Sequence, residues 1–531
     1  MSTINNLYNQ HPQGEPMPPF APMPPQPGMP LPPMNTGQGG VPSAPGPWLH
    51  NAAASALFPK WISRNALMVY FLALAVVSLM YSAYSLPWYY MLSGIVAVVV
   101  FFIFGRNLTE QTSVLKMHRE SLFEQRIFWI AFVPRVLWMI LIYAIFMQNY
   151  GDSFGFDNGD SAFYDHLGSD FAVTIRSGNF VNRWQYYSQT IDISDLGYAS
   201  YVGFIYSLTD NSVIALRLLK CVWSSFTVLL IYRLAKRNFN EQTARIAAIF
   251  CTLWPNFWYY CGVHLKETEM VFLSVLFVEQ ADQMLRSRQF TAWKVIPVLL
   301  IGASILTFRT PLALVAFLSL IFSVVMSSSR VVSWGKRIIV GMLAILLIGI
   351  TFGNQIEEQS RQLFETARGN MQESNMEWRA KREHGNAFAK YAGKSVFAPL
   401  IFTIPFPTMV RPWDGQEIQQ LNNGGNFVKN IVSFFTIFAM MILLISGKWR
   451  EHLLPLSFML GYIVVLVMSV FAQAERFHQP VMPLEFMFAA YGLSIVVTKP
   501  KYKRWFMYWC AVMFVAAIAW NWFKLAGRGL V

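Results

Sequence analysis

Long apolar runs separated by polar connections occupy most of the chain. The runs fall at about 65–85, 86–105, 127–149, 213–235, 243–262, 268–285, 293–308, 311–328, 337–353, 428–446, 452–472, 480–498 and 505–523. Most of them approach the roughly 20 residues that an α-helix needs to cross a bilayer. None alternates apolar and polar residues with a period of two, which argues against an outer-membrane barrel. The pattern therefore predicts an all-α polytopic membrane protein with about 13 transmembrane helices.

Lysine and arginine residues concentrate in alternate connections between these runs. They are Arg106, Lys116, Arg119, Arg126, Lys236, Arg237, Arg286, Arg288, Arg330, Lys336, Arg337, Lys448, Arg450, Lys499, Lys501, Lys503 and Arg504. Because loops rich in Lys and Arg stay in the cytoplasm, this distribution predicts a cytoplasmic N-terminus and a C-terminus on the other side. Two long connections, 150–212 and 354–427, are then extracytoplasmic loops.

The predicted domain organisation follows from the same pattern. Residues 1–60 form a proline-rich, disordered cytoplasmic tail, and residues 61–126 hold two N-terminal spans and a cytoplasmic loop. Residues 127–500 form the main transmembrane domain with both outer loops, and residues 501–531 form a last span and tail. The sequence does not open with a charged segment, a short apolar core and a cleavage site, so we expect no cleavable signal peptide and expect the first span to direct insertion.

Composition supports a membrane protein and excludes nucleic acid as a partner. Of the 531 residues, 55% are hydrophobic and 13% are charged, which is about half the charged share of a soluble protein. The net charge of +13 comes from cations in short loops between spans. The four cysteines lie in or beside apolar runs without metal-ligand spacing, so we expect them to be packing residues.

The first outer loop opens with an acidic and aromatic stretch. Downstream of Asp160, the residues Tyr164, Leu167, Phe171 and Ile175 recur at helical spacing. A helix with one apolar face beside a span is expected to lie along the membrane surface. The acids therefore lie where a lipid-borne substrate can be reached from outside the cytoplasm.

Polar residues recur at the predicted outer ends of the spans. They are Asp157, Asp160, Asp165, Asp170, His264, Lys266, Glu267, Arg309, Asp414, Glu475, Arg476 and His478. Charges near a bilayer are costly unless they are paired or lie in a wet cavity. A carboxylate can take the proton of an acceptor hydroxyl, and cations can stabilise a departing phosphate. This combination suits transfer of a group from a lipid phosphate.

Several stretches resemble the GT-C superfamily of membrane glycosyltransferases, closest to bacterial protein O-mannosyltransferases and lipid A aminoarabinose transferases. The likeness covers roughly 127–500 and is carried by Gly159-Asp-Ser-Ala-Phe-Tyr164, Ala215-Leu-Arg-Leu-Leu, Leu229-Leu-Ile-Tyr-Arg-Leu-Ala-Lys-Arg, Ala244-Arg-Ile-Ala-Ala, Trp254-Pro, Lys266-Glu267, Arg309-Thr-Pro and Arg476-Phe-His-Gln-Pro-Val-Met-Pro. The resemblance implies a GT-C-like fold in 127–500, a polyprenyl-phosphate-linked sugar donor and transfer on the outer face of the membrane. No cofactor is required by these residues, and the resemblance leaves room for a divalent cation.

The resemblance also suggests roles for individual residues. Asp160 matches the loop acid that acts as catalytic base or orients the acceptor, and Glu267 matches a second acid. The candidates for the donor phosphate are Lys266, Arg309, Arg476 and His478. The usual Asp-Glu pair is absent because Ser161 follows Asp160, so Asp157 is an alternative match. The two spans before residue 127 have no counterpart in the resemblance.

Each candidate also has a purely structural interpretation. Asp160 can cap a helix, Lys266 and Glu267 can form an exposed pair at a helix end, and Arg309 can reach along the membrane interface. The histidines can be ordinary hydrogen-bonded interfacial residues. Arg217 and Lys220 are expected to line a polar helix face and have no assigned role.

The sequence favours a membrane glycosyltransferase in a bacterial inner membrane. It is expected to move one sugar, with inversion, from a polyprenyl phosphate to a lipid, glycan or protein acceptor. The alternative is an envelope oligosaccharide polymerase or ligase that uses Arg411, Asp414, Arg476 and His478. A transporter or flippase is a third interpretation, and it requires charges near the bilayer midplane and repeated halves.

Overall fold

The computed structural model describes residues 58–155, 158–287, 291–328, 331–332, 406–411, 421–468 and 475–526, together with residues 335, 338, 342 and 530. Nearly all of the predicted tail, Asp157, Asp414, most of the second outer loop and the predicted span 337–353 lie outside the described residues. The limits of the predicted domains therefore stay predictions.

All regular elements in these residues are helices, apart from one isolated bridge between Ser85 and Val410. The N-terminal half contains α2 (Lys60–Met80), η1 (Ser82–Tyr84), α3 (Trp88–Val99), η2 (Val100–Phe104), α4 (Gly105–Gln111), α5 (Glu120–Tyr150), α6 (Asn158–Arg176), α7 (Phe180–Ser188), α8 (Ile193–Thr209), α9 (Val213–Asn238), α10 (Glu241–Leu253) and α11 (Pro255–Cys261). The C-terminal half contains α12 (Glu267–Arg286), α13 (Ala292–Phe308), α14 (Thr310–Met326), α20 (Asn423–Ile445), η4 (Lys448–Glu451), α21 (Leu453–Met468), η6 (Glu475–Val481), α22 (Met482–Val496) and α23 (Pro500–Ala526).

Six helical segments in the described residues are long and apolar enough to cross a membrane. They are Lys60–Met80, Trp88–Gln111, Glu120–Tyr150, Val213–Asn238, Asn423–Ile445 and Pro500–Ala526. Three further apolar helices are shorter, at Trp293–Phe308, Thr310–Met326 and Leu453–Leu466. The chain is thus a multi-pass helical membrane protein, but the predicted count of thirteen spans is not confirmed.

Proline explains one difference from the predicted spans. The apolar run 243–262 is divided at Trp254, which ends α10 and precedes α11, with Pro255 at the first position of α11. Proline lacks a backbone N–H, so it ends the preceding helix and suits the first turn of the next. Because α10 and α11 together lead the chain back, α9 and α12 run parallel and pack against each other.

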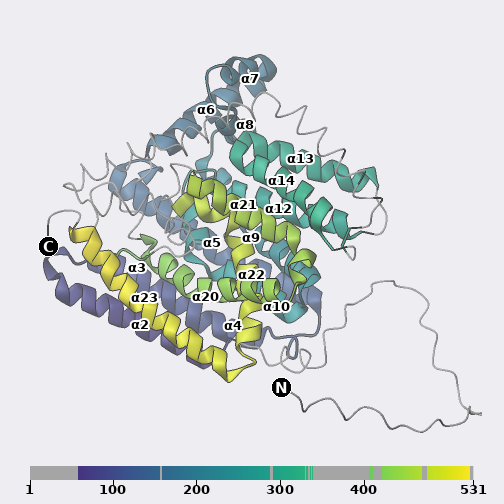
Figure 1. Cartoon of the computed structure of the whole chain (residues 1–531). Coiled ribbons are helices and arrows are strands. Elements are labelled where there is room, and N and C mark those ends of the chain that lie inside the picture. The colour runs from purple at the N-terminus through teal and green to yellow at the C-terminus, as the bar shows by residue number, and fades with distance from the viewer. Residues whose placement is uncertain are drawn as a thin grey trace, which may run out of the picture. The chain divides into compact units, whose positions relative to one another are not determined.

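The helix α9 also packs against α5 (Figure 1). A charged side chain links these two helices. Arg135, midway along α5, is fully buried. Its guanidinium donates to Ser224 Oγ of α9 at 2.9 Å and to the Cys251 carbonyl of α10 at 3.0 Å. Our sequence interpretation placed most charges at span ends and overlooked Arg135. Its paired donors are typical of a structural link, because an unpaired charge at this depth is costly.

The two N-terminal spans pack on the rest of the helical domain. The helices α2 and α23 lie side by side in Figure 1, and α3 contacts α20. Tyr70 of α2 donates to Asn423 Oδ1 of α20 at 2.8 Å. A Cβ on Gly424 would lie 2.8 Å from the carbonyl oxygen of Gly94, so these glycines allow α3 and α20 to cross closely. The spans absent from the resemblance therefore support α20.

The segment 150–212, predicted to be the first outer loop, folds into α6, α7 and α8, which Figure 1 shows at the top. Its predicted helix is present as α6, and the predicted position along the membrane surface stays a prediction. Leu167 and Phe171 are buried against Leu196 and Ala199 of α8. The apolar face is therefore covered by a second helix and is not free to contact lipid.

Candidate functional site

The acid Asp160 meets a cation from the far end of the chain. Asp160 lies in the first turn of α6, and its Oδ2 is 2.6 Å from Arg476 Nη1 of η6. The side chains of Asp160 and Arg476 are 50% and 31% exposed. This position is inside the helix, so the capping interpretation of Asp160 does not describe it. The pair joins an acid and a cation 316 residues apart and remains open to solvent.

Two of the predicted phosphate-binding cations share one aromatic ring. The guanidinium carbon of Arg309 lies 3.9 Å from the ring centroid of Phe477, and that of Arg476 lies 4.8 Å from it. Arg309 is the residue between α13 and α14, where Pro311 follows in the first turn. The break between these helices thus presents Arg309 beside η6.

Lys266 is held by the first outer loop. It is 7% exposed, its ammonium forms an ion pair with Asp195, and it donates to the Ser194 carbonyl at 2.9 Å. Burial raises the pKa of Asp195, whereas the charge and hydrogen bond of Lys266 and the charge of Arg309 lower it. The lowering is the larger effect, so the pKa of Asp195 is below its ordinary value. Sequence analysis missed Asp195, because no local pattern distinguishes it from other loop acids.

The acids gather around the phenol of Tyr164. Tyr164 donates to Asp195 Oδ1 at 2.6 Å. Burial raises the pKa of Tyr164, and the charges of Asp195, Glu267 and Asp160 raise it further. These three carboxylates therefore lie within electrostatic reach of one another around a single side chain.

A buried lysine fixes the turn that carries the candidates. Lys220 of α9 is fully buried, and its ammonium donates to the carbonyls of Val263 and Leu265. It also lies 3.5 Å from Glu269. Lys220 and Arg217, predicted to line a polar helix face, are both 0% exposed, so this face is buried.

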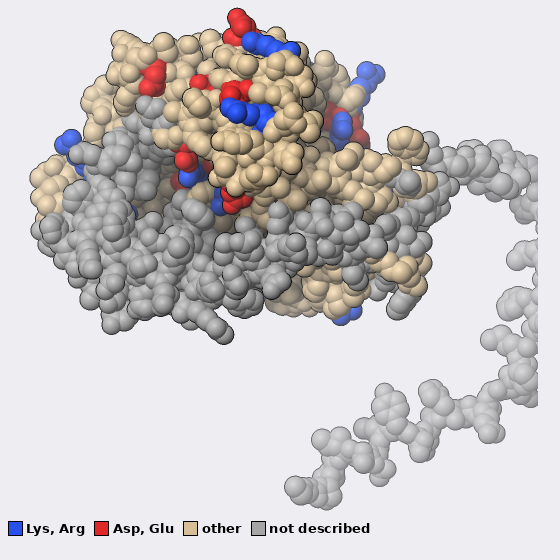
Figure 2. Space-filling model, turned by 90° about the horizontal axis from the view of Figure 1, so that it is seen from above, with Lys and Arg blue, Asp and Glu red and all other residues tan. Residues whose placement is uncertain are grey.

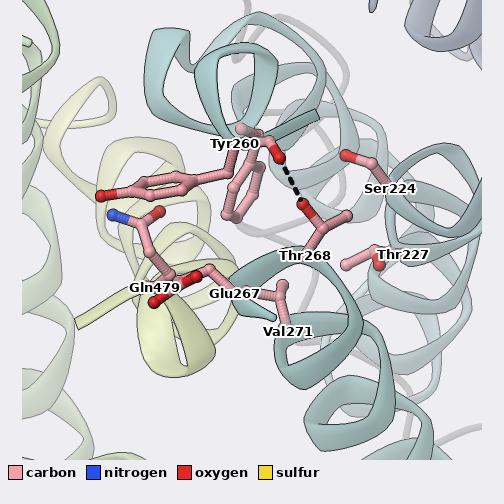
Figure 3. A pocket seen from close by; sticks show the side chains of 8 residues that line it. Ser224, Thr227, Tyr260, Glu267, Thr268, Val271 and Gln479 are labelled. Atoms are coloured by element: carbon pink, nitrogen blue, oxygen red, sulfur yellow. Dashed lines mark hydrogen bonds between the residues drawn. The ribbon is translucent and has the colours of Figure 1, made fainter. Parts of the chain in front are cut away.

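Glu267 lines a small cavity. The cavity encloses about 10 Å³, the room for roughly one water molecule. Its lining is Ser224, Thr227, Phe257, Tyr260, Glu267, Thr268, Val271 and Gln479, shown in Figure 3. Glu267 is 3% exposed, so its interpretation as part of an exposed pair with Lys266 is wrong.

His478 belongs to a second group of buried polar side chains. Its Nδ1 lies 3.3 Å from the ammonium of Lys429, which is 3.9 Å from Glu485. Burial raises the pKa of neighbouring Glu475 to about 7, against the opposing charge of Lys429 and hydrogen bonds from the amides of Asn256 and Asn426. His478 therefore lies beside Lys429, a buried cation that sequence analysis missed.

The remaining candidates lie elsewhere. His264 is fully buried among the rings of Phe154, Tyr198 and Tyr206. The backbone N–H of Arg411 donates to the Tyr84 carbonyl at 2.8 Å, near the first two helices. Within the residues that the structure describes, no group of three or more His, Cys, Asp or Glu side chains could hold a metal ion. The divalent cation therefore stays an untested prediction.

Charge is sparse on the exposed face above these helices. Figure 2 shows small groups of red and blue side chains, often side by side, on a mostly tan surface. The open part of the site, with Asp160 and Arg476, is thus an acid–cation pair on a protein with few charges.

A family model described as dolichyl-phosphate-mannose-protein mannosyltransferase matches residues 198–352. Neither the curated proteins nor the solved structures include a significant match. The family match supports a GT-C superfamily glycosyltransferase and so confirms the resemblance drawn from the sequence. The matched range contains Lys266, Glu267 and Arg309 and ends well before Arg476.

Proposed function

We propose that this GT-C-type membrane glycosyltransferase moves one sugar from a polyprenyl phosphate to an acceptor outside the cytoplasm. The family description makes mannose the first sugar to test. We further propose that the membrane is a bacterial inner membrane and that the acceptor is a lipid, glycan or protein. The main support is the meeting of Asp160, Arg476 and Arg309 at Phe477, from three separate segments of the chain.

The reaction requires a base and a positive site for the leaving group. Asp160 takes the proton from an acceptor hydroxyl or amine, whose heteroatom then attacks the anomeric carbon. The bond between that carbon and the phosphate oxygen breaks, and the polyprenyl phosphate leaves with the bonding electrons. Arg309 and Arg476 stabilise the added negative charge, with Lys266 beside them. One direct displacement inverts the anomeric configuration.

The exposure of these groups fits their different roles. Asp160 is half exposed, so an acceptor can approach it from outside. Lys266 is mostly buried and fixed by Asp195, so it acts as a positioned charge whose side chain needs little reorganisation. An electrostatic site of this kind loses little conformational entropy when the donor binds.

The substitution Asp160→Asn tests this function. We expect transfer of radiolabelled mannose from synthetic polyprenyl-phosphate mannose, in membranes that contain the native acceptors, to fall by roughly 10²- to 10⁴-fold. The matched control is Asp210→Asn, which alters a fully exposed acid 3.6 Å from Arg176 in the same loop. Unchanged transfer by a folded Asp160→Asn protein would remove Asp160 from the reaction.

A further inference from the structure

Two buried hydrogen-bond acceptors lie in the lining of the small cavity beside Glu267. Glu267 Oε2 and Gln479 Oε1 are buried without a hydrogen-bond partner in the described part of the chain. The amide nitrogen of Gln479 donates to the Glu475 carbonyl at 3.2 Å, which leaves its oxygen as the unsatisfied end. Figure 3 shows the side chains of Glu267 and Gln479 next to each other at this cavity.

The hydroxyl groups in the lining do not satisfy these oxygens. Thr268 donates to the Tyr260 carbonyl at 3.1 Å, and Thr227 donates to the Trp223 carbonyl at 2.9 Å. A hydroxyl has one proton to donate, so both threonines offer only their lone pairs to the cavity. A hydrogen-bond donor in the cavity would therefore satisfy an oxygen that the threonines leave unpaired.

The cavity also lies close to the proposed phosphate-binding residues. Glu267 directly follows Lys266, and Gln479 lies three residues after Arg476 in the same short helix. The sugar of a donor whose phosphate contacts Lys266 and Arg476 is taken to lie beside this cavity. The room for about one water molecule fits one hydroxyl group of that sugar.

We infer that this cavity is a specificity pocket for a single hydroxyl group of the transferred sugar, which donates its hydrogen bond to Glu267 or Gln479. The inference rests on the proposed function and extends it to the recognition of the glycosyl group. A bound cation suits the cavity less well, because hard divalent cations take about six or more oxygen ligands and the lining contains one carboxylate.

Monodeoxy analogues of the donor test the pocket. Polyprenyl-phosphate mannose and its analogues, each lacking one hydroxyl, are compared by kcat/KM in membranes with the native acceptors. For the wild type we expect one analogue to lose about 10- to 100-fold, as expected when a buried charged or polar group loses its partner. In Glu267→Gln or Gln479→Met, that one penalty should shrink toward 1-fold while the other analogues keep theirs.

The matched control is Gln242→Met, because Gln242 is also a buried glutamine and lies at the start of α10, away from the pocket. This variant should keep the full penalty. Thermal unfolding of each variant identifies those that fail to fold, and the second pocket variant then decides the result.

Three results would overturn the inference. In the first, the wild type transfers mannose and both pocket variants keep every penalty of the wild type. In the second, transfer requires an added cation and Glu267→Gln removes that requirement while the penalties remain, so the cavity holds a cation. In the third, the wild type transfers no sugar from any polyprenyl-phosphate donor, which refutes the proposed function and the inference with it.

Discussion

The parallel helices α9 and α12 hold buried charge in opposite ways at their two ends. At the C-terminal ends, Arg237 lies 2.7 Å from Asp282 and 3.0 Å from Glu279. Arg286 lies 2.9 Å from Asp282 and donates to the Glu451 carbonyl at 2.6 Å. Each of these charges has a partner of opposite sign, so this end forms a closed network.

The N-terminal ends have several buried polar atoms that make no hydrogen bond, although Glu269 lies 3.5 Å from Lys220. Among the described residues, two guanidinium nitrogens of Arg217, both ring nitrogens of His264, one oxygen of Glu267 and both oxygens of Glu269 accept or donate no hydrogen bond. Lys220 and Lys266 are satisfied at this end, through the carbonyls of Val263 and Leu265 and through Asp195 and Ser194. The same two helices thus have fully paired charges at one end and buried polar atoms without hydrogen bonds at the other.

The difference indicates different purposes. A buried polar group without a partner costs about 1–3 kcal/mol, so a folded protein is expected to contain few of them. The closed network costs little beyond desolvation and links α9, α12 and η4. The open group collects at the end that also carries Lys266 and the cavity, where a ligand or water can supply the missing bonds.

The largest effect on stability is expected from the closed network. Asp282→Asn removes the carboxylate that lies between Arg237 and Arg286, and both cations then lose a buried partner. We expect the free energy of unfolding to fall by about 3–5 kcal/mol, as is usual when one member of a buried ion pair is removed. Thermal and denaturant unfolding in detergent micelles measure this loss.

The loss of stability in Asp282→Asn is compared with the losses in two other variants. Glu124→Gln removes the partner of Arg233, whose side chain is 53% exposed, and should cost less than about 1 kcal/mol. Glu267→Gln, at the open end, should leave stability within about 1 kcal/mol of the wild type, because Oε2 has no bond to lose. A loss for Glu267→Gln as large as that for Asp282→Asn would abolish the distinction between the two ends.

A smaller, pH-dependent effect is expected from Glu475, on the open side. Its pKa of about 7 in the folded protein is above the ordinary carboxyl value, so the folded protein holds this proton more tightly than the unfolded chain. Stability from this group is therefore present at low pH and is lost as pH rises toward about 7. The melting temperature should fall more steeply in the wild type than in Glu475→Gln between about pH 5 and about pH 7.

Glu110→Gln is the control, since its side chain is 48% exposed and lies 3.7 Å from Lys116. It should retain the steep fall of the wild type. Parallel curves for the wild type and Glu475→Gln would mean that Glu475 titrates in its ordinary range.

The sequence predicted the long helices better than the short ones. The apolar runs 213–235, 428–446 and 505–523 correspond to α9, α20 and α23, because each is continuous over the length of a span. The run 243–262 reads as one span, but Pro255 divides it. Hydropathy measures how apolar a segment is and does not tell whether lipid or protein surrounds it, so the buried cations of α5 and α9 were overlooked or misjudged.

The sequence predicted the charged residues of the candidate site, but it did not predict which residues they contact. Asp160, Lys266, Arg309 and Arg476 stand out because each interrupts or follows an apolar run. Their contacts join residues 71 positions apart for Lys266 and Asp195 and 316 apart for Asp160 and Arg476. No local spacing encodes such pairs, so Asp195 could be found only in the folded chain.

The smallest effect on stability is expected from an ion pair in the first outer loop. This pair shows how much of the stability comes from ion pairing alone and how much from burial. Arg183 lies 2.6 Å from Asp170, and the two side chains are 38% and 25% exposed. The hydrogen bond from Arg183 lowers the pKa of Asp170, so its contribution to stability is present above the ordinary carboxyl range and is lost as pH falls through the lowered pKa. Because solvent screens the pair, Asp170→Asn should lower the free energy of unfolding by at most about 1 kcal/mol near pH 7.

Unfolding of Asp170→Asn and Asp282→Asn under the same conditions compares a partly exposed ion pair with a buried one. Equal losses would show that burial adds nothing to the network at the C-terminal ends of α9 and α12, whereas the expected difference would attribute its strength to burial.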